Sequence, residues 1–119
     1  MKKFKVIFFI FLLFPTLLWA AEIVRIAPLT IQIKSSTTTV TGTAGKVPAT
    51  ALAGRENIAL YNVDNGTETV WCGDSTVTSG TGFPLTSSAP AISLDLDSSV
   101  DVYCISDGTS TDLRSLESK

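Results

Sequence analysis

Short runs of alternating apolar and polar residues, separated by turn residues, most constrain how this chain folds. The alternation covers residues 29–34, 58–63, 92–97 and 100–105, and it has the period of strands that bury one face. Gly, Asn, Asp, Ser and Pro punctuate these runs, and no segment has a helical period. We therefore expect an all-β fold, a small antiparallel β-sandwich or a jelly-roll or barrel-like domain of about seven or eight short strands.

The first 20 residues have the three parts of a cleavable secretory signal helix. Lys2, Lys3 and Lys5 form a positive start, residues 6–14 are an unbroken apolar run, and Ala20 offers a small residue for cleavage. The alternative, an uncleaved membrane anchor, usually needs about 20 apolar residues, and this stretch is shorter. We expect cleavage after Ala20 and export to the periplasm, the cell surface, the medium or a virion.

Removal of the signal makes the chain more acidic. Three of the nine basic residues and none of the eleven acidic residues are lost, so six face eleven and the net charge is −5. Such a Ser/Thr-rich chain has no electrostatic footprint for nucleic acid. It also has no histidine, which excludes the usual Ser-His and Cys-His pairs and imidazole zinc sites. We expect a non-enzymatic protein without a cofactor, and no membrane contact after cleavage.

Residues 35–45, SSTTTVTGTAG, carry no apolar period and little charge. This composition favours a flexible linker or a long loop, and the alternative is a polar edge strand through Thr37, Thr39 and Thr41. We expect an N-terminal strand and Ser/Thr-rich linker over residues 21–45, followed by a sandwich domain over residues 46–119.

Residues 64–66, Asp-Asn-Gly, have the composition of a hairpin turn. A three-residue loop there would pair the flanking strands and place four apolar residues on one face, which we expect to be the core face: Ile58, Leu60, Val70 and Cys72. The opposite face of that hairpin would hold Tyr61 and Trp71. The sequon at residues 65–67 is interpreted as part of the turn, because Asn-Gly is the pair that a hairpin favours.

Cys72 and Cys104 are the only cysteines, and the alternation turns both toward the core. Export places them in an oxidising compartment, so we expect a disulfide that contributes about 3 to 4 kcal/mol. The alternative is a pair of buried free thiols. A redox-active pair is disfavoured, because the spacing is not Cys-x-x-Cys and no basic neighbour lowers a thiol pKa.

Two groups of residues are candidates for binding. An exposed aromatic surface for a protein or a glycan is predicted from Tyr61, Trp71 and Tyr103. The alternative is that these rings pack under a loop or against the second sheet. Weak candidates for a calcium ion are Asp95, Asp97 and Asp101. No known calcium-loop spacing is present, so we expect no metal.

Four stretches of turn and core residues stand in a particular order: VPATALAGRENIALYN (47–62), TVWCGDSTVTSGTGFPL (69–85), ISLDLDSSVDVYCIS (92–106) and DLRSLE (112–117). In this order the chain resembles a small β-sandwich domain of tailed-bacteriophage structural proteins. The matching positions are Pro48, Leu52, Gly54, Arg55, Asn62, Gly73, Pro84, Leu85 and Arg114. The chain departs from that family in its signal and in Cys72 and Cys104, where such domains carry apolar residues; both departures fit an exported, disulfide-bonded version.

The resemblance implies a structural role and gives no catalytic residue. We expect a non-enzymatic exported structural or adhesion module of phage or prophage ancestry, associated with a virion or a cell surface, that acts through surface contacts. Its partner would be a protein or a cell surface, and a second copy of the chain is one candidate. The alternative is a periplasmic or secreted small binding protein for a glycan or peptide.

Overall fold

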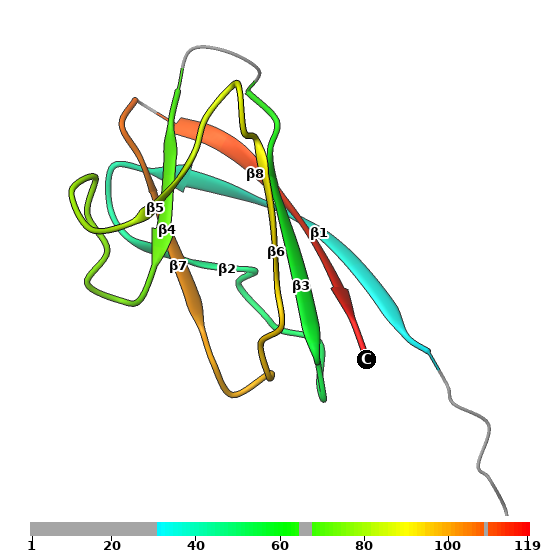
Figure 1. The fold of residues 1–119 in the computed structure, drawn as a ribbon. Helices are drawn as coiled ribbons and strands as arrows, with labels where there is room; N and C mark the ends of the chain where they lie inside the picture. The colour runs from blue at the N-terminus through cyan, green and yellow to red at the C-terminus, as the bar shows by residue number, and fades with distance from the viewer. Residues whose placement is uncertain (1–30, 65–67, 109) are drawn as a thin grey trace, which may run out of the picture.

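The computed structural model describes residues 31–64, 68–108 and 110–119, and all regular structure within these residues is β. Eight strands form two four-stranded antiparallel sheets that pack as an open sandwich (Figure 1). The first sheet has the order β1 (Ile33–Thr41), β8 (Ser110–Ser118), β3 (Asn57–Asn62) and β6 (Ala91–Leu94). The second sheet has the order β2 (Gly45–Val47), β7 (Val102–Ser106), β4 (Val70–Gly73) and β5 (Phe83–Leu85). The predicted all-β sandwich is confirmed.

The core lies between the sheets and follows the alternation of the sequence. In β8 every second residue from Thr111 to Glu117 is buried, and the residues between them are exposed. The buried apolar residues come from seven strands of both sheets: Val40, Val47, Ile58, Leu60, Val70, Cys72, Leu85, Val102, Cys104 and Leu113. One face of each contributing strand is thus removed from water, which is the main favourable term in folding.

The predicted hairpin around residues 64–66 is wrong. β3 pairs with β6 and β8, and β4 pairs with β5 and β7, so the chain passes from one sheet to the other between them. The inward positions are nevertheless the predicted ones, since Ile58, Leu60, Val70 and Cys72 are all buried. Alternation identifies the buried face of a strand but does not identify the sheet to which it belongs. Residues 65–67, with the sequon, lie outside the described residues.

The favoured linker over residues 35–45 is also wrong, and the alternative of a polar edge strand is confirmed. β1 pairs with β8 along its whole length. Its polar side chains find partners on β8, where Ser36 Oγ lies 2.6 Å from Ser115 Oγ and Thr39 Oγ1 donates to Asp112 Oδ1 at 2.9 Å. Hydrogen bonding therefore supports a strand that apolar periodicity does not reveal. The first residues of the expected strand over 29–34 lie outside the described residues.

The later strands lie where the sequence predicts them, but their ends differ from the predicted ends. β6 ends at Leu94, before the predicted end at residue 97, and β7 begins at Val102 rather than at residue 100. β8, the last strand, covers nine residues, Ser110–Ser118. Gly54, before β3, has a φ of 72°, which glycine adopts without strain.

The two edges of the sandwich differ. At the closed edge, β1 lies against β2 and β7, and a short connection over residues 42–44 joins the two sheets. Val40 and Val47 are only 2% and 1% exposed there. At the open edge are β6 and β5, the last strands of the two sheets. Ile92 and Leu94 of β6 are only partly buried, so the core reaches the surface at this edge.

Candidate functional site

A groove of about 310 Å³ lies at the open edge of the sandwich. Its apolar lining comes from both sheets and from the chain that connects β6 to β7: Cys72, Phe83, Ile92, Leu94, Leu96, Val100 and Val102. Gly73, Asp74 and Asp101 complete the lining. We call this surface the open-edge groove. Its lining is mostly apolar.

The groove exists because inward-facing residues at this edge lack a cover. Phe83 pairs with buried Cys72, so it lies on the inner face of β5, yet 54% of its surface is exposed. Val100 is 45% exposed. Large apolar side chains that remain in water mark a surface to which a partner adds favourable burial.

Two carboxylates stand beside this apolar surface. Asp74 Oδ1 accepts hydrogen bonds from the hydroxyl and the backbone N–H of Thr76, at 2.7 and 2.8 Å, and these bonds lower the pKa of Asp74. Asp101 forms an exposed ion pair with Lys46 at 2.7 Å. Among the described residues Asp74 has no ion pair, so its charge remains available to a cationic partner.

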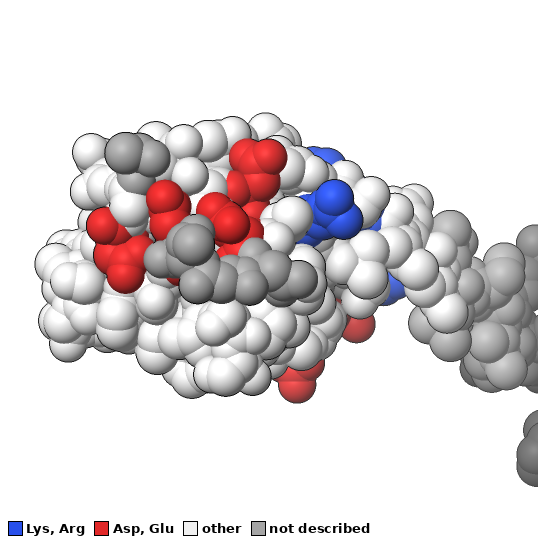
Figure 2. Space-filling model, turned by 90° about the horizontal axis from the view of Figure 1, so that it is seen from above, with Lys and Arg blue, Asp and Glu red and all other residues white. Residues whose placement is uncertain are grey.

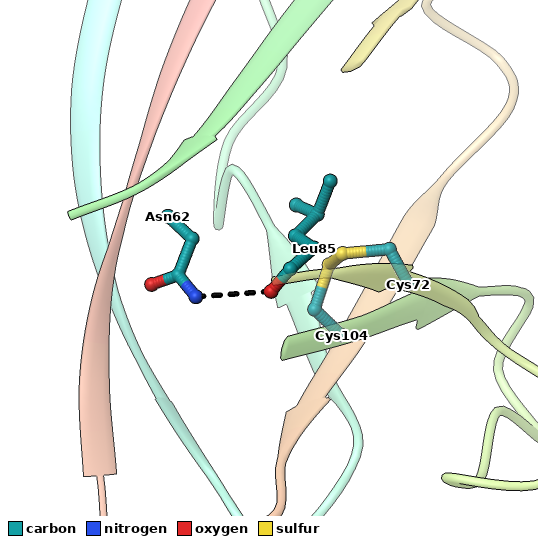
Figure 3. The surroundings of a disulfide bond; sticks show 4 residues. All are labelled: Asn62, Cys72, Leu85 and Cys104. Atoms are coloured by element: carbon teal, nitrogen blue, oxygen red, sulfur yellow. Dashed lines mark hydrogen bonds between the residues drawn. A yellow bond between two sulfur atoms is a disulfide. The ribbon is translucent and has the colours of Figure 1, made fainter. Parts of the chain in front are cut away.

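The predicted disulfide is confirmed, and it lies beneath the groove. Cys72 and Cys104 are directly opposite each other on β4 and β7, with their Cα atoms 4.1 Å apart. Close by, the buried amide of Asn62 on β3 donates from Nδ2 to the backbone carbonyl of Leu85 on β5, at 3.1 Å (Figure 3). One covalent link and one polar link therefore hold the second sheet in place under the groove.

A buried ion pair that the sequence analysis did not assign holds the side of the groove. The Arg55 Nη1 lies 2.8 Å from Glu117 Oε1, and the two side chains are 1% and 0% exposed. Arg55 also donates from Nε to the Leu96 carbonyl, and from Nη2 to the carbonyls of Asp97 and Val100. The second oxygen of Glu117 accepts from the backbone N–H of Leu52. This pair fixes the segment that carries Leu96 and Val100.

Two signals could have found this pair. Arg55 directly follows Gly54, where the chain turns into β3. Glu117 occupies an inward position in the alternation of β8, two residues beyond Ser115. A charge at an inward position needs a buried partner, and Arg55 is that partner.

The three predicted aromatic contact residues do not form one surface. Tyr61 lies on the outer face of the first sheet, opposite Ala91 and Arg114, and is 38% exposed. Trp71 and Tyr103 are diagonal neighbours on the outer face of the second sheet, because Trp71 pairs with Ile105. Only the latter two are brought together, and Tyr61 faces the opposite side of the molecule.

Trp71 itself is only partly exposed, as the alternative of packing under a loop predicts. Its indole Nε1 is buried and has no hydrogen-bond partner within the described residues. A Cβ added at Gly82, at the end of the β4–β5 loop, would lie 2.9 Å from the Trp71 Cβ and 2.7 Å from Val77 Cγ2. Glycine thus allows this loop to pack closely against the tryptophan.

The weak calcium candidates each have a separate partner. Asp95 accepts from Asn57, Asp97 accepts from the backbone N–H of Ser99 at 2.6 Å, and Asp101 pairs with Lys46. The bonds from Ser99, chiefly from its backbone N–H, lower the pKa of Asp97. In the described residues no group of three His, Cys, Asp or Glu side chains could hold a metal ion.

Acidic side chains also gather at the end of the sandwich where β3 and β7 end (Figure 2). The residues of this end that carry carboxylates are Asp64, Glu68, Asp107 and Asp112. Glu68 accepts from the Ser106 hydroxyl, and Asp107 accepts from the backbone N–H of Thr69. These bonds tie the loops of this end together and give each of the two carboxylates a structural use.

Comparison with protein-family models, with curated proteins and with solved structures yields no match. In the part of the chain that the structure describes, no helix has the length and apolar character needed to cross a bilayer.

Proposed function

We propose that this protein is an exported, non-enzymatic structural or adhesion module that acts through surface contacts, and that the open-edge groove is its main contact surface. The observation that carries the proposal is the incomplete cover of the core, with Phe83 and Val100 about half exposed beside partly buried Ile92 and Leu94. A partner that covers these side chains gains about 25 cal/mol for each Å² of apolar area removed from water.

Export is supported by two independent features. The first 20 residues have the composition of a secretory signal. Cys104, which is 0% exposed, forms a disulfide with Cys72, and structural disulfides persist in oxidising compartments. A phage or prophage ancestry rests on the resemblance of residues 47–116 to virion domains, and the two-sheet sandwich is the architecture that this resemblance implies.

A small peptide-binding protein is the second candidate, and one observation favours it. β6 is an edge strand that pairs on one side only, with β3, so its other side offers backbone groups next to the apolar groove. An extended peptide can add to such an edge while alternate side chains enter the groove. A glycan is less well supported, because Trp71 is half-buried and separated from Tyr61.

The test uses the full chain, produced with its own N-terminus in a bacterium that has an oxidising periplasm. Val100→Asp places a charge in the groove, and Ser93→Asp, on the outer face of β6, is the matched control. Cells are separated into cytoplasm, periplasm, medium, cell-bound material and particles, and intact mass is measured with and without reduction. We expect wild type and the control to start at Ala21, to carry the disulfide and to bind cells or particles, with at least tenfold less bound Val100→Asp.

Two results would contradict this proposal separately. A cytoplasmic product that starts at Met1 with two free thiols would exclude export. An unchanged distribution of Val100→Asp would exclude the open-edge groove as the contact surface.

A further inference from the structure

The chain leaves the sandwich at the edge opposite to the groove. Gln32 exchanges two backbone hydrogen bonds with Lys119, at 3.2 and 3.1 Å, so β1 is held at the start of the first sheet. Just there Ile31 and Ile33 are 73% and 66% exposed. The residues between the expected cleavage position and this point are AEIVRIAPLT, residues 21–30, which lie outside the described residues.

This segment and the groove are chemically complementary. Val24 and Ile26 flank Arg25 at alternate positions, so a strand that turns both apolar side chains toward the groove turns Arg25 away from it. The groove offers Leu94 and Phe83 to the apolar pair. Asp74, which lines the groove and has no ion pair among the described residues, offers negative charge to the new N-terminus.

The distance from β1 to β6, compared with the length of residues 21–30, indicates whether the same molecule or a second copy supplies this segment. β1 and β6 are the first and last strands of the first sheet, three strand spacings or about 14 Å apart. Within one molecule, this crossing uses about four or five of the residues nearest β1, at about 3.3 Å each. At most residues 21–26, about 20 Å when extended, would then remain for the groove. A segment that comes from another molecule keeps all of residues 21–30, about 33 Å when extended, for binding.

We infer that the open-edge groove binds residues 21–30 of a second copy of this chain, added as a strand beside β6. The donor segment and the acceptor groove lie at opposite edges of the first sheet, so the contact is heterologous and joins copies head to tail into rings or filaments. This inference rests on the proposed function, because it requires export and cleavage after Ala20.

The test uses the purified exported full chain and two complementary variants. Ile26→Asp removes the donor and keeps the groove, and Val100→Asp removes the groove and keeps the donor. Ser93→Asp is again the control. Molar mass is followed against protein concentration by sedimentation velocity and by light scattering after size exclusion. Wild type and the control should form oligomers, and each donor or groove variant should be monomeric, with self-association at least tenfold weaker.

An equimolar mixture of the two monomeric variants should form dimers and nothing larger, because it contains one intact donor and one intact groove per pair. Cooperative thermal unfolding and an intact disulfide establish that each variant is folded. Should Val100→Asp not fold, Phe83→Asp, at a site that is 54% exposed, takes its place.

Three results would overturn the inference. A wild type that stays monomeric with an unchanged Ile26→Asp variant would show that the segment does not join copies. Monomeric variants that do not form dimers on mixing would show that the groove takes its own chain or a foreign partner. If Val100→Asp still loses cell or particle binding in the first of these cases, the proposed function stands and only the choice of partner fails. A product that starts at Met1 would overturn both proposals.

Discussion

The two edges of this sandwich differ in how completely they cover the hydrophobic core. At the closed edge a short connection between β1 and β2 carries the chain from sheet to sheet, and Val40 and Val47 are almost completely buried. At the open edge the chain connects β5 to β6 without covering the residues between them, and Phe83 and Val100 stay about half exposed. The same β-strand alternation therefore produces a sealed core at one edge and an exposed apolar groove at the other.

At the open edge, hydrogen bonds and not apolar burial hold the backbone in place. Apolar burial alone would leave the segment around residues 96–100 loosely held, since Leu96 is only partly buried. Arg55 replaces that burial with three hydrogen bonds to the backbone of this segment and one to Glu117. A buried polar network can thus fix a surface whose side chains remain free to contact a partner.

The largest expected effect comes from breaking this network. Arg55→Leu leaves the Glu117 carboxylate buried without its cation and leaves three carbonyls unpaired, so we expect the free energy of unfolding to fall by about 3–5 kcal/mol. Urea denaturation measures the change. Arg114→Leu, an exposed arginine on β8, is the control and should stay within about 0.5 kcal/mol of wild type. A loss below about 1 kcal/mol for Arg55→Leu would show that the pair does not hold the open edge.

A matched pair of smaller changes compares the edges directly. Val40→Ala at the closed edge removes two buried methyl groups and leaves a cavity, so we expect a loss of about 2 kcal/mol. Val100→Ala at the open edge removes the same atoms from a residue that is 45% exposed, and the loss should be below about 0.5 kcal/mol. Both values come from thermal or urea unfolding of the monomer at low concentration. Equal losses at the two edges would contradict the distinction between them.

The smallest expected effect is a local loosening of two turns at low pH, and both turns lie at the open edge. Hydrogen bonds from Ser99 lower the pKa of Asp97, and bonds from Thr76 lower the pKa of Asp74, from an ordinary value of 3.8. A depressed folded-state pKa stabilises the fold fully above the unfolded value, and this contribution is lost as the pH falls through the folded value. We therefore expect both turns to loosen only below about pH 4, where the protection of the Ser99 and Thr76 amides from hydrogen exchange, relative to the intrinsic rate at each pH, falls.

The variant Asp97→Asn should lower the protection of the Ser99 amide at neutral pH and should remove the further fall in its protection at acid pH. The amide of Val40, in the closed edge, serves as the internal reference and should not respond. A simultaneous change at Val40 would mean that acid unfolds the whole sandwich rather than one edge.

Alternation in the sequence predicts which side chains enter the core, because burial depends only on the face of each strand. Ile58, Leu60, Val70, Cys72 and Cys104 are buried as expected, and the inward positions of both cysteines, together with the predicted export, indicate the disulfide. Alternation does not predict strand partners, so it could not reveal that β3 and β4 lie in different sheets. β1 could not be found from apolar residues, since serine and threonine hydrogen bonds support it.

The candidate site was less predictable than the fold, and the reason is topological. A groove between β5 and β6 exists only because these two strands are the last of their sheets, and no local pattern specifies which strands end a sheet. For the same reason Tyr61 and Trp71, adjacent in the expected hairpin, lie on opposite faces of the molecule. Arg55 and Glu117 are distant in sequence, and only the assembled sandwich brings them together.

The amide of Asn62 has a consequence for the uniqueness of this structure. Its Nδ2 donates to the carbonyls of Glu68 and Leu85, and its Oδ1 accepts from the backbone N–H of Asp64 and from the Thr111 hydroxyl. Any sliding of one sheet over the other would separate Nδ2 from the Glu68 and Leu85 carbonyls and leave this buried donor unpaired, which costs about 1–3 kcal/mol. Aliphatic side chains can pack in several relative alignments of the two sheets. The hydrogen bonds of Asn62 are satisfied in one of them, so this residue selects a single alignment.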